Sequence, residues 1–318
     1  MPKTDRKILV TGAFGQIGSE LIPVLKHKYG ENNVVAMGHN NIPSDFDGIL
    51  EKGDIRDKNV ISSVVKKHSI NTIYHLSSLL SVNGEINPSV TWDINMNGLK
   101  NVLDIGVEFK ARIFWPSSIA AFGPSTPRIN TPQHTVLEPT TIYGVTKYAG
   151  EGLCRYYNIK YGLDVRSVRY PGIISWKTPP GGGTTDYAVA IFYDGLKTGK
   201  YECFVKPDTV LPMMYIDDAI KGTVDLMEAD TKNIGVRNSY NIAAISFQAK
   251  ELEQELKKYI PDLKVIYKPD KRQKIADSWP KSIDDSQARL DWGWKHEYDL
   301  AKMTEVMVES LKKKFKMI

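Results

Sequence analysis

The stretch Lys7-Ile-Leu-Val-Thr11, followed at once by Gly12-Ala-Phe-Gly15-Gln-Ile-Gly18, decides the fold of this chain. The first part is a short β-branched run and predicts a buried strand. The second is a glycine-rich turn, and residues 19–29 after it predict a helix. This order is the context of a dinucleotide-binding unit, in which glycines permit a tight turn and close approach to a pyrophosphate. A glycine-rich turn without a ligand is the alternative interpretation.

Strands continue to alternate with helices as far as residue 171. We expect strands at 33–37, just before Gly53, and at 71–76, 113–123 and 164–169. This alternation predicts an α/β fold, a Rossmann-type doubly wound parallel sheet with a smaller, mostly C-terminal substrate-binding domain. We assign residues 1–171 and 211–247 to the dinucleotide-binding domain. Residues 172–210 and 248–318 form the predicted substrate-binding domain.

Polar residues follow several of these strands, at the edge where a cofactor would lie. After the second strand come Gly38 and His39, with no carboxylate and no arginine, so a 2′-phosphate is neither rejected by charge nor attracted. His39 is either a cofactor contact or a solvated loop residue. Asp54 meets the adenine amino group or caps the helix near Asp57. Ser77 and Ser78 line a crevice or are turn residues.

Tyr143 and Lys147 form a Tyr-x-x-x-Lys pair inside a stretch, 143–161, that predicts a helix without proline. Residues four apart share one face of a helix. A lysine ammonium beside a phenol favours the phenolate and lowers its pKa from about 10. Such a phenol can take a proton from an alcohol while a hydride leaves the same carbon. Ser118, at the end of the preceding strand, can meet the same substrate oxygen.

A glycine- and threonine-rich stretch, Thr178-Pro-Pro-Gly-Gly-Gly-Thr-Thr-Asp186, opens the next helix. Thr184, Thr185 and Asp186 either cap that helix or belong to a mobile lid that binds a small carboxylate. Asp217 is a cap candidate for a later helix. Asn95 lies within a long helix that starts near Pro88, where an asparagine is usually solvated.

The chain has 318 residues, 42% hydrophobic and 25% charged, with a net charge of +5. Such a weak, scattered charge argues against nucleic acid. Two cysteines without a His/Cys cluster predict neither a disulfide framework nor a metal site. No apolar run is long enough for a bilayer, and the first strand starts too early for a leader peptide. We therefore expect a cytoplasmic protein with no membrane partner.

Taken together, these motifs resemble the extended short-chain dehydrogenase/reductases, the superfamily that includes UDP-galactose 4-epimerase. The resemblance is closer to one branch, the short-chain L-threonine 3-dehydrogenases. It is carried by Thr141-Ile-Tyr-Gly-Val-Thr-Lys147, Arg169-Tyr-Pro-Gly-Ile-Ile-Ser175, Pro180-Gly-Gly-Gly-Thr-Thr-Asp-Tyr187 and Ile275-Ala-Asp-Ser-Trp-Pro280. The departure is Gly38-His39, where that branch usually has an acidic residue.

The resemblance implies NAD as cofactor and oxidation of the L-threonine β-hydroxyl to L-2-amino-3-ketobutyrate. It implies that Tyr143 is the general base, that Lys147 lowers its pKa, and that Ser118 binds the reacting hydroxyl. The substrate-binding residues would be Ser81, Ser118, Tyr143, Thr184 and Thr185. The cofactor-binding residues would be Gly12, Gly15, Gln16, Ile17, Gly18, His39, Asp54, Ile55, Leu76, Ser77, Ser78, Asn95, Ser117, Tyr143, Lys147, Tyr170, Gly172 and Ile173.

The resemblance also implies a homodimer formed through two helices, here 88–109 and 143–161. It further implies coupling to a PLP-dependent 2-amino-3-ketobutyrate CoA ligase that consumes the product. The nearest alternative is a nucleotide-sugar epimerase or dehydratase, which uses the same fold and base. A protein that senses NAD(P) without turnover is a more distant alternative, because such proteins usually lack the Tyr/Lys pair.

Overall fold

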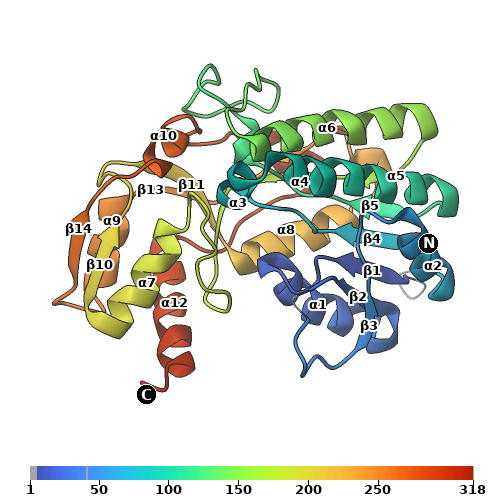
Figure 1. Ribbon diagram of the computed structural model, residues 1–318. Helices are drawn as coiled ribbons and strands as arrows, with labels where there is room; N and C mark the ends of the chain where they lie inside the picture. Colours follow the sequence, from blue (N-terminus) through green and yellow to red (C-terminus); the bar gives the residue numbers. More distant parts are fainter. Residues whose placement is uncertain (1–5, 41, 318) are drawn as a thin grey trace.

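Six parallel strands form the central sheet, and the computed structural model describes residues 6–40 and 42–317 (Figure 1). The strand order is β3-β2-β1-β4-β5-β7. The chain leaves β1 toward one side of the sheet and then returns to build the other side from β4, so the topology reverses between β1 and β4. The strands are β1 (Ile8–Thr11), β2 (Val34–Gly38), β3 (Ile49–Lys52), β4 (Thr72–His75), β5 (Arg112–Phe114) and β7 (Val165–Arg166).

Helices cover both faces of this sheet, as the doubly wound prediction requires. Leu9 of β1 packs into a cluster with α2, α5 and α6, whereas its neighbours Ile8 and Val10 pack into a second cluster with α1 and α8. This alternation follows from the two-residue period of a strand. The helices are α1 (Gln16–Tyr29), α2 (Lys58–Lys67), α5 (Gly98–Phe109), α6 (Ile142–Tyr161) and α8 (Ile216–Glu228). The predicted fold class is confirmed.

Two predicted strands are each broken into two pieces. The stretch expected at 113–123 gives β5 and then β6 (Ser117–Ser118), which leaves the main sheet. Pro116 between them has no N–H to donate to a ladder. The stretch expected at 164–169 gives β7 and then β8 (Val168–Tyr170). Strand β6 pairs with β8, and β8 pairs with β12 (Tyr240–Asn241), in a separate three-stranded sheet.

The long helix expected from Pro88 contains a local widening. It consists of α4 (Pro88–Trp92), a π-helical segment (Asp93–Asn97) and α5. Asn95, in that segment, is buried rather than solvated as expected. Its side chain accepts from the Leu79 backbone N–H at 2.8 Å and donates to the Leu79 carbonyl and to Thr146. The short helix α3 (Ser81–Ile86) precedes α4.

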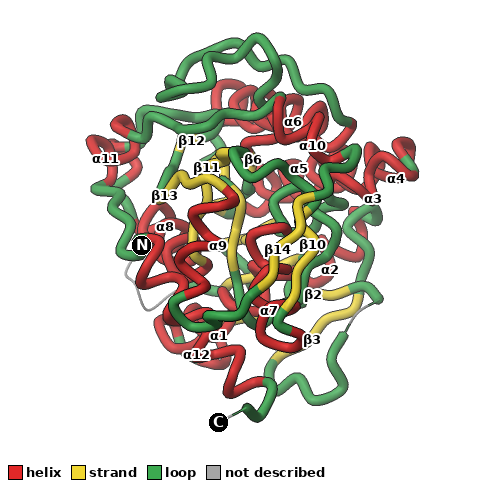
Figure 2. Tube along the Cα trace, turned by 90° about the vertical axis from the view of Figure 1, so that its left-hand side faces the viewer, coloured by secondary structure: helices red, strands yellow, loops and turns green. Residues whose placement is uncertain are grey.

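The smaller part of the molecule is built mainly from elements after residue 171, and Figure 2 views the molecule from this side. Its sheets are β13-β11-β9 and β10-β14. One hydrophobic cluster runs from Ile8 of β1 to Leu311 of α12, so both parts share a core. The two-domain division stays a prediction. The elements are β9 (Gly172–Ile174), α7 (Tyr187–Thr198), β10 (Lys200–Cys203), β11 (Val210–Tyr215), β13 (Ile245–Gln248), α9 (Ala249–Lys257), β14 (Lys264–Tyr267), α10 (Arg272–Asp277), α11 (Ser286–Trp292) and α12 (Leu300–Lys314).

Short 3-10 turns connect several elements, at Glu31–Asn33, Ile119–Ala121 and Thr231–Asn233. The predicted cap at Asp217 is wrong, because α8 begins at Ile216 with Tyr215 at the capping position. The neighbouring Asp218 instead accepts from the backbone N–H groups of Glu297 and Tyr298. Among the described residues, no helix has the length and apolarity needed to cross a bilayer.

Candidate active site

The glycine-rich turn after β1 packs tightly against the end of β4. Gly12 has φ +66°, and a Cβ there would lie 2.7 Å from the backbone nitrogen of Ser77. A Cβ on Gly18 would lie 2.5 Å from the carbonyl oxygen of Gly12. Helix α1 then starts at Gln16 without a side-chain cap from the described residues. Its first N–H groups are therefore free to bind an anion, so the turn fits a pyrophosphate.

Two adjoining cavities lie along the carboxyl ends of the strands. One, of about 380 Å³, is lined at the adenosine end by residues of the turn, β2 and the loops after β3 and β4. The other, of about 160 Å³, reaches from Gln16 to the catalytic candidates on α6. Predicted site residues that line one or both are Gly12, Gly15, Gln16, Ile17, His39, Asp54, Ile55, Leu76, Ser77, Ser78, Ser81, Ser117, Ser118, Tyr143, Lys147, Tyr170, Gly172, Ile173, Thr184 and Thr185.

Two predicted cofactor contacts have side chains committed elsewhere. Tyr170 lines the small cavity, but its hydroxyl is hydrogen-bonded to Thr223 on α8. The side chain of Asn95 is hydrogen-bonded to the backbone of Leu79, and Asn95 lines neither cavity. A further predicted contact that lines neither cavity, Gly18, has no side chain and allows helix α1 to pack closely against the turn at Gly12.

Tyr143 and Lys147 project from the same face of α6, as predicted. The Lys147 ammonium lies 5.4 Å from the centre of the Tyr143 ring and 4.7 Å from that of Trp115. It donates to the carbonyl of Pro116 at 2.7 Å. Ser118, two residues further along, is hydrogen-bonded to the Tyr143 phenol. Helix α6 is started by Thr141, whose hydroxyl accepts from the Gly144 N–H at 3.1 Å.

Burial, rather than the lysine, dominates the acidity of Tyr143. Burial raises the pKa of Tyr143 to about 12, and the hydrogen bond from Ser118 only partly opposes it. Burial likewise lowers the pKa of Lys147 to about 7. Burial therefore outweighs any effect of Lys147 on the pKa of Tyr143 in the chain on its own, and the role expected of Lys147 stays a prediction. The physical reason is that both charged forms lose solvation, and the ammonium faces Pro116 and the aromatic rings.

The glycine-threonine loop closes the small cavity from the side of the C-terminal part. The carboxylate of Asp186 accepts from the backbone N–H groups of Gly181, Gly182 and Gly183 at 2.7, 2.7 and 2.8 Å. It caps the loop, not helix α7. Thr184 is buried, and its hydroxyl oxygen has no hydrogen-bond partner among the described residues. An unsatisfied buried hydroxyl at a cavity wall is suited to a polar ligand.

At the adenosine end, Asp57 caps α2, so the alternative that Asp54 does so is wrong. The Asp54 carboxylate accepts instead from Arg56, at 3.1 Å and 3.0 Å from Nε. His39 Nε2 lies 3.7 Å away from it. Arg56 was not singled out in the sequence, because nothing local to it indicates that it folds back beside the groove.

A buried charge network behind the catalytic residues was also missed. Arg169 of β8 donates to both carboxylate oxygens of Glu151, at 2.8 and 2.7 Å, and both side chains are almost fully buried. The hydroxyl of Ser117 donates to Glu151 at 2.6 Å. Glu151 follows Lys147 by four residues and Tyr143 by eight. That spacing on a buried helix face was a signal present in the sequence.

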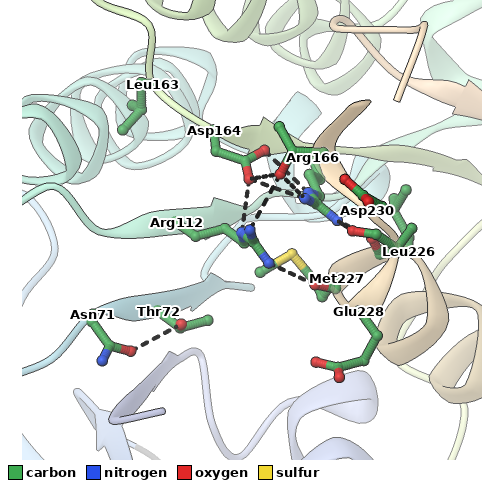
Figure 3. A network of polar contacts seen from close by, with 12 residues as sticks. Asn71, Thr72, Arg112, Leu163, Asp164, Arg166, Leu226, Met227, Glu228 and Asp230 are labelled. Carbon is green, nitrogen blue, oxygen red and sulfur yellow. Dashed lines mark hydrogen bonds and ion pairs between the residues drawn. The ribbon is translucent and has the colours of Figure 1, made fainter. Parts of the chain in front are cut away.

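A larger cavity, of about 460 Å³, lies at the amino ends of the strands, at the opposite end of the sheet from the glycine turn. Figure 3 shows the network of polar contacts beside it. Arg112 pairs with Asp164 at 2.7 Å and donates to the carbonyl of Met227 at 3.0 Å. Arg166 donates to the carbonyl of Leu226 at 2.6 Å. These cations satisfy the C-terminal carbonyls of α8 and one carboxylate. Their role is structural.

The parallel sheet, glycine turn and Ser/Tyr/Lys arrangement define a nucleotide-dependent enzyme of the extended short-chain dehydrogenase/reductase type. Residues 8–243 match the NAD dependent epimerase/dehydratase family, and the chain belongs to that family. Its cofactor is NAD, and the glycine turn and the groove fit that group.

Within this family, the chain is similar to several L-threonine 3-dehydrogenases. It is 46% identical to the mitochondrial L-threonine 3-dehydrogenase of Bos taurus, over 96% of this chain and 82% of that protein. It is 49% identical to the L-threonine dehydrogenase of Clostridium difficile, whose structure superposes with a TM-score of 0.95 over 97% of this chain and 98% of that one. A monomeric L-threonine 3-dehydrogenase from a metagenome is 48% identical, with a TM-score of 0.94 over 96% and 99%.

Proposed function

We propose that this protein oxidises L-threonine at the β-hydroxyl, with NAD, to L-2-amino-3-ketobutyrate. The observation that carries the proposal is the small cavity of about 160 Å³, whose lining includes Ser118, Tyr143 and Lys147 together with Ser81, Thr184 and Thr185. The similarity to L-threonine 3-dehydrogenases at 46–49% identity supports the same substrate.

In this proposal Tyr143 accepts the proton of the substrate hydroxyl, and Ser118 holds that hydroxyl in place. Lys147 anchors the cofactor ribose and fixes the Pro116–Ser118 edge through its bond to the Pro116 carbonyl. When bound, the oxidised nicotinamide supplies the hydride acceptor and a positive charge that lowers the pKa of a nearby phenol. Ser81 and the buried hydroxyl of Thr184 bind the amino acid, and the loop held by Asp186 excludes water.

The alternative of a nucleotide-sugar epimerase or dehydratase is less favoured by the cavity. A nucleotide sugar needs a roomy and basic pocket for its diphosphate, and the substrate end here is lined largely by hydroxyls and small residues. A non-catalytic sensor would have no use for a half-buried tyrosine next to a buried lysine and a serine. We therefore place both alternatives second.

The test is the rate of NADH appearance with L-threonine, L-serine and L-allo-threonine, each with NAD. We expect L-threonine to give the highest kcat/KM. UDP-glucose and UDP-galactose are incubated in parallel, and their interconversion without threonine oxidation would contradict the proposal.

The base is tested separately by Tyr143→Phe. We expect kcat to fall by about a thousandfold, because general base catalysis contributes on that order. Tyr161→Phe is the matched control, since it removes a phenol oxygen from the exposed end of the same helix. Equal activity of Tyr143→Phe and the wild type would overturn the assignment of the base.

We further propose a cytoplasmic homodimer whose product passes to a PLP-dependent 2-amino-3-ketobutyrate CoA ligase. Exposed apolar side chains on α4 and α6 support the dimer. They are Val90, Trp92, Val145, Tyr148, Tyr156 and Ile159. Helices α4 and α6 lie side by side (Figure 1), and these six exposed residues are together called here the α4–α6 face.

A further inference from the structure

The adenosine end of the groove lacks the carboxylate that commonly binds a 2′-hydroxyl at the end of the second strand. Gly38 ends β2, and an aromatic ring fills the space beside it. A Cβ at residue 38 would lie 2.8 Å from two ring carbons of Phe14 and 2.9 Å from Ile42. The ring of Phe14 is braced edge to face against Phe46, with 5.1 Å between centres. An acidic side chain therefore cannot be built at residue 38 without displacing Phe14.

Asp54, which lines the same cavity, is paired with a cation. Asp54 accepts from the side chain of Arg56 and, at 2.9 Å, from its backbone N–H. These bonds hold the pKa of Asp54 below its usual value, so it stays ionised and paired. Arg56 also reaches Asp93 at 3.3 Å. A paired carboxylate repels an incoming anion far less than an isolated one does.

Donors suited to a phosphate face the same space. The side chains of His39 and Arg56 are 53% and 40% exposed, and both line the adenosine cavity. Asn40 lines it as well. A guanidinium presents several N–H groups in one plane and matches the oxygens of a phosphate. The cavity thus has no carboxylate at the end of β2 that would repel a phosphate, and three side chains that line it can donate hydrogen bonds.

We propose that this end of the groove admits a 2′-phosphate, so that NADP binds there as well as NAD, with His39 and Arg56 donating to the phosphate. The proposal rests on the groove being the dinucleotide site of the proposed function. The missing Cβ of Gly38 leaves room for the ring of Phe14.

The first test measures binding without any amino acid, by isothermal titration calorimetry with NAD, NADP, adenosine 5′-monophosphate and adenosine 2′,5′-bisphosphate. We expect dissociation constants for NADP and NAD within about tenfold of each other, and tighter binding of the bisphosphate than of the monophosphate. NADP binding weaker than NAD binding by roughly a hundredfold or more would overturn the proposal.

The second test uses paired variants and the same titrations. His39→Asp is expected to weaken NADP relative to NAD by about tenfold through like-charge repulsion, whereas His39→Gln keeps a donor and has a smaller effect. Arg56→Ala removes a donor and unmasks Asp54, so it also weakens NADP selectively. Lys67→Ala is the charge-matched control, because Lys67 pairs with Glu51 outside the two cavities. Unchanged NADP-to-NAD ratios in His39→Asp and Arg56→Ala would contradict the assignment of the donors.

Failure of this inference is separable from failure of the proposed function. If the protein oxidises threonine but binds NAD much more tightly than NADP, only the 2′-phosphate site is wrong. If it binds both dinucleotides but does not oxidise threonine, only the substrate assignment is wrong.

Discussion

Burial governs the chemistry of individual side chains at this site. Tyr143 and Lys147 lie side by side, yet each is pushed toward its neutral form because the surrounding protein solvates charge poorly. The charged side chains behind the site, Glu151 and Arg169, form a buried ion pair with each other. The site is thus a small polar cavity held in place by a buried ion pair.

The pH dependence of stability follows from the burial of Lys147. Burial lowers its pKa from 10.5 to about 7 in the folded state. Between these values the unfolded chain binds more protons than the folded one, so stability rises with pH across that window. We expect this rise, measured by urea denaturation, to be lost in Lys147→Met and kept in Lys67→Met, whose lysine is exposed. The same pH dependence in Lys147→Met and the wild type would contradict the argument.

The Glu151–Arg169 pair gives a second prediction for single side chains. Glu151→Gln leaves Arg169 buried without a counter-charge and should cost about 3 kcal/mol of unfolding free energy. Glu202→Gln, which breaks the exposed pair with Lys268, should cost less than about 0.5 kcal/mol.

Adding Arg169→Met to Glu151→Gln should recover part of the loss, since no buried charge then remains unpaired. Chemical denaturation measures each value. Equal stability of Glu151→Gln and the wild type would argue against the network.

Among the elements, helix α6 and the glycine-threonine loop carry the site. Helix α6 presents Tyr143, Lys147 and Glu151 on one side because they are spaced by four residues. The Asp186 carboxylate holds the loop through hydrogen bonds from three backbone N–H groups.

We therefore expect Asp186→Ala to release the loop, since three backbone N–H groups lose their common acceptor. The KM for L-threonine should rise by about tenfold, and cleavage in limited proteolysis should increase at residues 180–183. Asp186→Asn retains an acceptor oxygen and should lose less. Wild-type KM and wild-type protease resistance in Asp186→Ala would show that the loop does not depend on this carboxylate.

For the whole molecule, the α4–α6 face predicts self-association. Ile159, at its edge, is 70% exposed. A charge placed there should oppose burial of this face against a second copy. In light scattering coupled to size exclusion, we expect the wild type to run as a dimer and Ile159→Glu as a monomer. Leu290→Glu on α11, a site 81% exposed and outside this face, is the control. A monomeric wild type, such as the metagenome relative is described to be, would contradict the prediction.

The local sequence pattern was enough to predict many of the strands and helices of this molecule. The order of strand, glycine turn and helix at residues 7–29 predicted β1, the turn and α1, because steric rules and periodicity act over a few residues. The alternation of elements predicted the parallel sheet. The four-residue spacing of Tyr143 and Lys147 placed them on one face of α6, and Thr141 and Gly162 bound that helix with a local cap at each end.

Other features depended on contacts between distant segments, and these only the tertiary structure decided. The burial that raises the pKa of Tyr143 comes from elements that the sequence does not place beside it. Arg169 meets Glu151, Arg56 folds onto Asp54, and Phe14 fills the space beside Gly38. Sequence pattern reports which residues share a face or a turn. Solvation, charge pairing and close packing are set by neighbours from elsewhere in the chain, and these physical effects determine which candidates can react and which ligand the groove admits.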